Sequence, residues 1–207
     1  MRLALFMVLT VMVLLVVGCS LGAKTTTTTQ AASGTKWVDL RGKAAQDAPA
    51  GAMLFRQPDG QLVGYVPSGA ISGITWQAYQ NSSDGYSVEY PEGWITQQSD
   101  NEGHQGLVVY PPGTDVSASI PGGAPGIGVG WVSSYTIPSA DDPSVGALKD
   151  IQASGVQGTL ITQGALGSSM IAVFPRAGGY LFVSGDASTD TLIEVFLHMV
   201  SSLKFSG

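Results

Sequence analysis

A short alternating stretch from Tyr86 to Tyr90, followed by a proline turn, most constrains how this chain folds. Its aromatic and aliphatic residues fall at every second position, which is the period of a strand with one buried face. Pro91 cannot extend the ladder of backbone hydrogen bonds, and Gly93 permits a tight turn. The stretch therefore predicts a strand and a turn that return Trp94 to a hydrophobic core.

The composition favours one strand-rich domain. A chain of 207 residues can form one well-packed core with additional segments. Hydrophobic residues make up 44%, and 28 glycines with 11 prolines indicate many short strands and turns. The formal net charge is -6, and without Arg2 the remaining 8 basic and 15 acidic residues give -7. No Lys or Arg cluster could follow a phosphate backbone, so we expect no binding to nucleic acid.

The first 18 residues are typical of an export signal. Arg2 precedes an apolar run from Leu3 to Val17, which is interrupted only by Thr10 and followed by Gly18. The run is shorter than the roughly 20 residues that a membrane-spanning helix needs, and polar sequence follows at once. Cys19 is the sole cysteine, so no intramolecular disulfide can form.

The residues Val16–Cys19 resemble the lipobox of bacterial lipoproteins. That resemblance implies that the signal is cleaved between Gly18 and Cys19, and that acyl chains on Cys19 anchor the protein to a membrane with its domain outside the cytoplasm. Because Ser20 follows the cysteine, the resemblance points to the outer membrane if the host has two. The alternative is a secreted or membrane-spanning segment with an incidental cysteine.

The chain after the signal divides into three predicted parts. Residues 19–36, with five threonines in a row from Thr25 to Thr29, read as the lipidated cysteine and a flexible tether. Residues 37–73 read as an N-terminal extension that contains a hairpin, because Pro58-Asp59-Gly60 separates two short apolar runs, 53–57 and 61–66. Residues 74–207 form the main predicted domain.

In the main domain we expect strands connected by short turns, and two helices. The polar stretch from Gln97 to Gln105 is expected to be a loop. Asp142 and Pro143 favour a helix start, with an apolar stripe that ends at Gly155. A second helix is predicted from Thr189 to Ser202. Its polar side comprises Glu194, His198 and Ser201. The expected strands lie at residues 75–79, 86–90, 107–110, 126–132, 159–162, 170–174 and 180–184. In the extension, residues 37–40 are either a further short strand or an anchor packed against the domain.

The stretch Gly85–Trp94, the strand that begins at Tyr180 and the closing segment Val200–Phe205 together resemble the PsbP-like family. The resemblance implies an α+β fold in which a mainly antiparallel sheet is flanked by helices, an α/β/α sandwich shared with a Ran-binding nuclear-import protein of the Mog type. A named member of the family is an extrinsic subunit of the oxygen-evolving photosystem. A shared fold leaves the function open.

Catalytic and metal-binding motifs are missing from the sequence. His104 and His198 are the only histidines, and neither has the spacing of a zinc site. No serine has nucleophile-elbow neighbours, and Gly126–Gly130 lacks the spacing of a dinucleotide-binding loop. We therefore predict no catalytic residue, no metal and no cofactor. The aromatic residues Trp37, Tyr65 and Tyr135 are candidates for contacts with a protein or a sugar, and the alternative is that they are partly buried, which is more common for such residues.

These observations favour a non-enzymatic lipoprotein that presents its domain to an unidentified protein partner. The alternative is a lipoprotein that binds a small ligand or a metal, and a photosystem-associated protein or a hydrolase is a weaker hypothesis. A hydrolase would need His104 or His198 within reach of a serine or a carboxylate.

Overall fold

We describe the protein from a computed structural model, which defines residues 36–57, 59–68, 71–117, 124–164 and 169–206. By its contacts the chain divides into two units, Met1–Ala32 and Ser33–Gly207, and all described residues belong to the second. The predicted signal, Cys19 and nearly all of the predicted tether lie outside the described residues.

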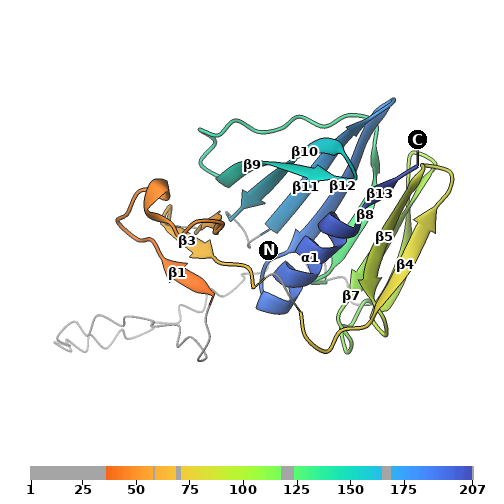
Figure 1. Cartoon of the computed structure of the whole chain (residues 1–207), viewed down its shortest axis with the longest axis horizontal. Coiled ribbons are helices and arrows are strands. Elements are labelled where there is room, and N and C mark those ends of the chain that lie inside the picture. The colour runs from red at the N-terminus through yellow and green to blue at the C-terminus, as the bar shows by residue number, and fades with distance from the viewer. Residues whose placement is uncertain (1–35, 58, 69–70, 118–123, 165–168, 207) are drawn as a thin grey trace, which may run out of the picture. The chain divides into compact units, whose positions relative to one another are not determined.

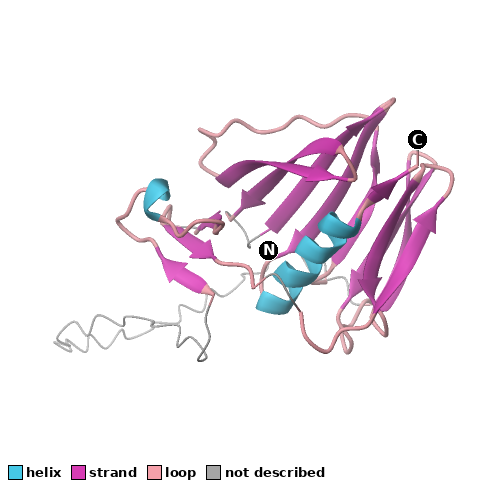
Figure 2. Ribbon diagram, in the orientation of Figure 1, coloured by secondary structure: helices cyan, strands magenta, loops and turns pink. Residues whose placement is uncertain are grey.

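A seven-stranded antiparallel sheet is the largest element of the domain (Figures 1 and 2). Short turns connect most of its neighbouring strands, and the pairing is antiparallel throughout. Its strands, in spatial order, are β6 (Ile95–Asn101), β7 (His104–Tyr110), β8 (Ile127–Val132), β12 (Gly179–Asp186), β11 (Ser169–Arg176), β10 (Val156–Gln163) and β9 (Val145–Ala153).

Two smaller antiparallel sheets accompany it. The first contains the predicted hairpin of β2 (Met53–Arg56) and β3 (Leu62–Tyr65), with β1 (Trp37–Asp39) added beside β3. A short 3-10 helix (Ala45–Asp47) lies between β1 and β2. The second sheet pairs β4 (Trp76–Asn81) with β5 (Tyr86–Pro91), and β5 with β13 (Lys204–Phe205). The stretch that predicted a strand is β5, and Trp94 after it is half-buried against the core.

The helix α1 (Asp190–Ser202) covers one face of the large sheet, as Figure 1 shows. Thr189 caps it, because the Thr189 hydroxyl accepts a hydrogen bond from the backbone N–H of Leu192. Phe196 and Met199 of α1 are fully buried in the core that also contains Val183 of β12. The predicted helix at the C-terminal end is confirmed within one residue.

The predicted helix after Asp142 is wrong, because residues 145–153 form the strand β9. Asp142 accepts hydrogen bonds from the backbone N–H and the hydroxyl of Ser144, which closes a turn instead of capping a helix. Ser154 and Gly155 both have positive φ and join β9 to β10 as a two-residue hairpin turn. Gly155, which was expected to end a helix, therefore lies in the turn that reverses the chain between β9 and β10.

The predicted α/β/α sandwich is also wrong. In the described residues the protein has three antiparallel sheets and a single α-helix, so helices do not flank the large sheet on both faces. The expected loop at 97–105 is largely strand as well: β6 and β7 pair through a turn at Glu102 and Gly103. The described part of the domain is mainly antiparallel β structure with one α-helix.

The first small sheet packs directly on the large one. A Cβ atom on Gly146 of β9 would lie 2.4 Å from the carbonyl oxygen of Leu54 and 2.9 Å from the Cα of Phe55. Arg56 donates a hydrogen bond to the carbonyl of Val145, and the Thr162 hydroxyl donates one to the carbonyl of Leu54. The backbone of β2 therefore lies against β9, where the large sheet presents a glycine.

Candidate functional site

A shallow groove lies between α1 and the chain that enters β4. We call it the α1–Trp76 groove, and its volume is about 260 Å³. Four α1 residues form one wall, because positions three, four and seven apart share a face of a helix. The groove is lined by Glu194, Leu197, His198 and Ser201 from α1, and by Pro67, Ile71 and Trp76 from the opposite side.

Glu194 lines this groove and is a buried carboxylate, with 7% of its side chain exposed. Its Oε1 atom accepts hydrogen bonds from Lys36 Nζ at 2.5 Å and from the Tyr65 hydroxyl at 3.0 Å. The backbone N–H and the hydroxyl of Ser68 donate to the same oxygen at 2.8 and 2.9 Å. This cluster, which we call the Glu194 clasp, joins the N-terminal extension to α1.

The second carboxylate oxygen of Glu194, Oε2, has no hydrogen-bond donor among the described residues. Every hydrogen bond to this side chain ends on Oε1, and Oε2 accepts none from the described residues. No fully buried side-chain oxygen or nitrogen of the described residues lacks a partner, so Oε2 keeps contact with solvent. An acceptor is therefore left available where Glu194 lines the groove.

The clasp keeps Glu194 ionised. Burial on its own would raise the pKa of Glu194, but hydrogen bonds from Lys36, Ser68 and Tyr65 outweigh it and hold the pKa below its ordinary value of 4.5. Burial, together with the carboxylate of Glu194, raises the pKa of the Tyr65 hydroxyl, which stays a hydrogen-bond donor. The sequence pattern had placed Glu194 on the outer, polar side of the helix, and that prediction is wrong because the extension covers it.

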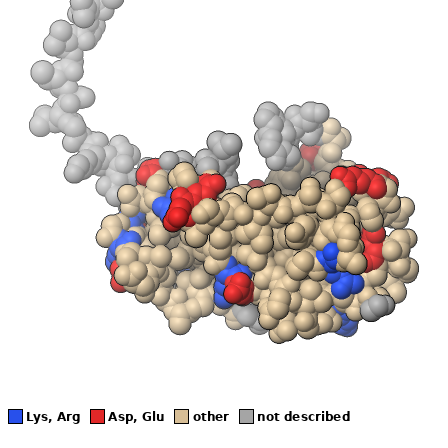
Figure 3. All heavy atoms as spheres, turned by 90° about the horizontal axis from the view of Figure 1, so that it is seen from above, with Lys and Arg blue, Asp and Glu red and all other residues tan. Residues whose placement is uncertain are grey.

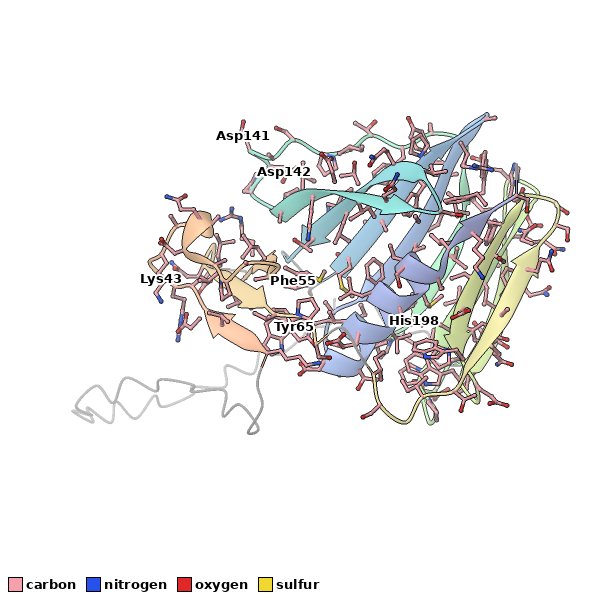
Figure 4. All side chains as sticks on the ribbon, in the orientation of Figure 1. Lys43, Phe55, Tyr65, Asp141, Asp142 and His198 are labelled. Carbon is pink, nitrogen blue, oxygen red and sulfur yellow. The ribbon has the colours of Figure 1, made fainter. Side chains whose placement is uncertain are left out.

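His198 forms part of the wall. Its ring stacks on the indole of Trp76, with ring centroids 3.5 Å apart and planes inclined by 14°. Its Nε2 atom lies 3.0 Å from Oε2 of Glu89 on β5. Figure 4 shows His198 on the side of α1 that faces β4 and β5. The histidine thus links the helix to the second small sheet.

His104 occurs in a similar arrangement elsewhere. Its Nδ1 atom lies 2.5 Å from Oδ1 of Asp84, and its ring stacks on Trp131 at 5.0 Å. The other oxygen of Asp84 accepts a hydrogen bond from Asn81, which also donates to the carbonyl of Gln105. This cluster ties the turn between β4 and β5 to β7.

Both histidines therefore meet the condition that a hydrolase would impose, because each contacts a carboxylate. In the described part of the chain, however, neither histidine is hydrogen-bonded to a serine hydroxyl. The hydroxyls of Ser201 and Ser202 donate to backbone carbonyls of α1 instead. The geometry is that of a His–carboxylate pair to which the described serines add no activated nucleophile.

The aromatic residues named as candidates for contacts are partly or fully buried. Tyr65 is fully buried, and Trp37 is half-buried with its ring against Tyr65 and Phe55. The indole N–H of Trp37 donates to Asp190 at 2.8 Å. As Figure 4 shows, Tyr65 and Phe55 lie between the first small sheet and α1. Trp37 and Tyr65 therefore fasten the extension to the domain, and Tyr135 is half-buried.

Carboxylates dominate the charge around the α1–Trp76 groove. Glu89 contacts His198, Asp190 lies one helical turn before Glu194, and Glu92 hydrogen-bonds through its backbone to the residue before Trp76. Lys36, which pairs with Glu194, is the positively charged side chain bound to the residues that line the groove. On the face drawn in Figure 3, by contrast, charged groups are small and scattered among uncharged surface.

Known proteins give little further guidance. No family model matches the sequence, and no curated protein matches it. Among solved structures, the chain is similar to cyanobacterial PsbP (CyanoP) from Synechocystis sp. PCC 6803, with a TM-score of 0.43 and 14% sequence identity. The match covers 67% of this chain and 98% of that one. The structural neighbour is thus a PsbP-like protein.

Two further observations bear on the site. In the described residues no group of three or more histidine, cysteine, aspartate or glutamate side chains is placed to hold a metal ion. No helix in the described part of the chain has the length and apolar character needed to cross a membrane.

Proposed function

We propose that the protein is a lipid-anchored lipoprotein of the cell envelope, and that its domain is a non-enzymatic module that binds a protein partner. The α1–Trp76 groove carries the second part of the proposal. Its lining is apolar at Pro67, Ile71 and Leu197 and includes an ionised carboxylate with an available oxygen, that of Glu194. Pockets that take up one side chain of a partner and lose their water in the complex are typical of hot spots in protein interfaces.

The size of the groove supports a protein partner over a small ligand. A volume of about 260 Å³ lies below the roughly 300–1,000 Å³ of most small-molecule sites. One long side chain of a partner would fill it, while the surrounding surface would make the remaining contacts. The anchor on Cys19 would keep the domain at the membrane, where partner and domain meet at high effective concentration.

Site-specific photo-crosslinking in living cells of the host tests the partner. A photoreactive residue is placed at Ser201, at the exposed lip of the groove, and separately at Gln152, an exposed position on β9 outside it. We expect a discrete crosslinked product of higher mass from position 201 and not from position 152. No product, or the same products from both positions, would contradict the proposed binding surface.

A further inference from the structure

We propose that the α1–Trp76 groove binds an arginine side chain of the protein partner. This inference deepens the proposed function and rests on it. Its starting point is Glu194, a side chain more than nine-tenths buried that offers one oxygen, Oε2, with no hydrogen bond from the described residues.

Most charged side chains around the groove are acidic. Four carboxylates belong to this region, Glu194, Glu89, Glu92 and Asp190, and Glu194 pairs with an ammonium group, that of Lys36. With histidine counted as neutral, the formal charge of these five side chains is -3. Lys36 is held on Oε1 and Ser68, so it does not occupy Oε2. A cationic group is the complement that this environment selects.

The apolar lining of the groove suits a long basic side chain. The same groove that contains the Glu194 carboxylate is lined by the apolar side chains of Leu197, Ile71 and Pro67. These can pack against the methylene groups of a long basic side chain. Trp76 stacks on His198 and also lines the groove, so part of its indole ring can contact a side chain bound there. Of the two basic side chains, arginine fits better, because its planar guanidinium stacks on aromatic rings and pairs with carboxylate oxygens.

The carboxylate of Glu194 is already oriented by its neighbours. The clasp fixes Glu194 before any partner arrives, because Oε1 already accepts hydrogen bonds from Lys36, Tyr65 and Ser68. A guanidinium that binds Oε2 therefore finds the acceptor already oriented, and binding does not include the entropic cost of ordering the Glu194 side chain. The same contacts explain why a carboxylate at this position remains ionised while buried.

The test uses the full-length protein in detergent micelles and two fluorescein-labelled pentapeptides, Gly-Gly-Arg-Gly-Gly and the same peptide with citrulline in place of arginine. Citrulline keeps the shape and removes the charge. Fluorescence anisotropy should show at least tenfold tighter binding of the arginine peptide, and this binding should weaken as salt is raised. Equal affinity for the two peptides, or no binding of the arginine peptide, would overturn the inference.

Two variants locate the binding. Ser201→Arg places a basic side chain at the lip of the groove and should reduce arginine-peptide binding at least tenfold. Gln152→Arg adds the same charge outside the groove and should change it less than twofold. Equal effects of the two variants would contradict binding in the groove.

Two further outcomes separate this inference from the proposed function. Free arginine that competes as strongly as the peptide would assign the site to a small cation and overturn the partner side chain. A crosslinked product at position 201, combined with equal binding of the arginine and citrulline peptides, would overturn the arginine inference and still support binding of a protein partner.

Discussion

Glu194→Gln is expected to lower the free energy of unfolding by about 3 kcal/mol at neutral pH, because it removes one partner of a buried ion pair. The variant keeps the size of the side chain but leaves Lys36 without its countercharge, and Lys36 is itself only 27% exposed. The Tyr65 hydroxyl and the N–H of Ser68 would face a neutral oxygen. Urea denaturation of the wild-type and variant proteins measures the difference.

Asp39→Asn is the matched control. Asp39 and Arg41 also form an ion pair, at 2.6 Å, but their side chains are 55% and 60% exposed. Exposed ion pairs contribute little to stability because solvent screens them. We expect no measurable change from this variant, and a loss equal to that of Glu194→Gln would contradict the distinction between the two pairs.

The effect of Glu194 should depend on pH in a defined direction. Its pKa in the folded protein lies below the ordinary value of 4.5, so folding favours the ionised form. The stabilisation is therefore fully present above pH 4.5 and is lost as the pH falls through the folded pKa. The difference in unfolding free energy between wild type and Glu194→Gln should be constant near neutral pH and shrink in acid. A difference that grows in acid would show that the pKa of Glu194 is raised in the folded protein, and would contradict this prediction.

Gly146→Ala is expected to destabilise the protein by about 3 kcal/mol, at the upper end of overpacking effects. The added Cβ would lie 2.4 Å from the carbonyl oxygen of Leu54 and 2.9 Å from Arg56 N, both backbone atoms of β2. A side chain could rotate away, but a paired strand must shift as a whole. Thermal and urea unfolding measure the loss, and hydrogen exchange should show the largest increase in β2 and β3.

Gly128→Ala is the control for this prediction. Gly128 is also in a strand of the large sheet, but its added Cβ would meet only side chains of Ser184 and Val108, at 3.6 and 3.8 Å, and the carbonyl of Leu107 at 4.0 Å. These are ordinary van der Waals distances, so the change should stay within about 0.5 kcal/mol. Equal losses in the two variants would mean that β2 is not held against β9.

Much of the fold could be predicted from local sequence signals. The hairpin of β2 and β3 follows from Pro58-Asp59-Gly60, and α1 follows from its apolar stripe. The strand β5 and its turn follow from alternation and Pro91. In each case the residues that determine the element are neighbours in the chain.

The errors arise where local patterns support two structures. The spacing of Val145, Leu148 and Ile151 suits a helix, but the turn at Ser154 and Gly155 pairs this segment with β10. Gln97 to Asn101 is polar because β6 is an edge strand with both faces largely exposed. Polarity alone could not distinguish such a strand from a loop.

The candidate site could not be predicted because its contacts are distant in sequence. Lys36 and Tyr65 lie 158 and 129 positions from Glu194. A helical pattern places Glu194 on the polar side and gives no sign that a separate sheet covers it. A signal that the sequence did contain was the early Trp37 and Tyr65, since two large aromatic side chains in the extension needed a surface to pack on.

We propose that lipid on Cys19 holds this domain at a membrane. Intact-mass and N-terminal peptide mass spectrometry of the protein, extracted with detergent from host membranes, tests it most directly, with Cys19→Ala as the control. We expect a mature chain that begins at Cys19 and carries acyl chains, and an unlipidated precursor for the variant. A mature chain that starts at another residue, an unmodified Cys19, or normal processing and full membrane retention of Cys19→Ala would contradict it.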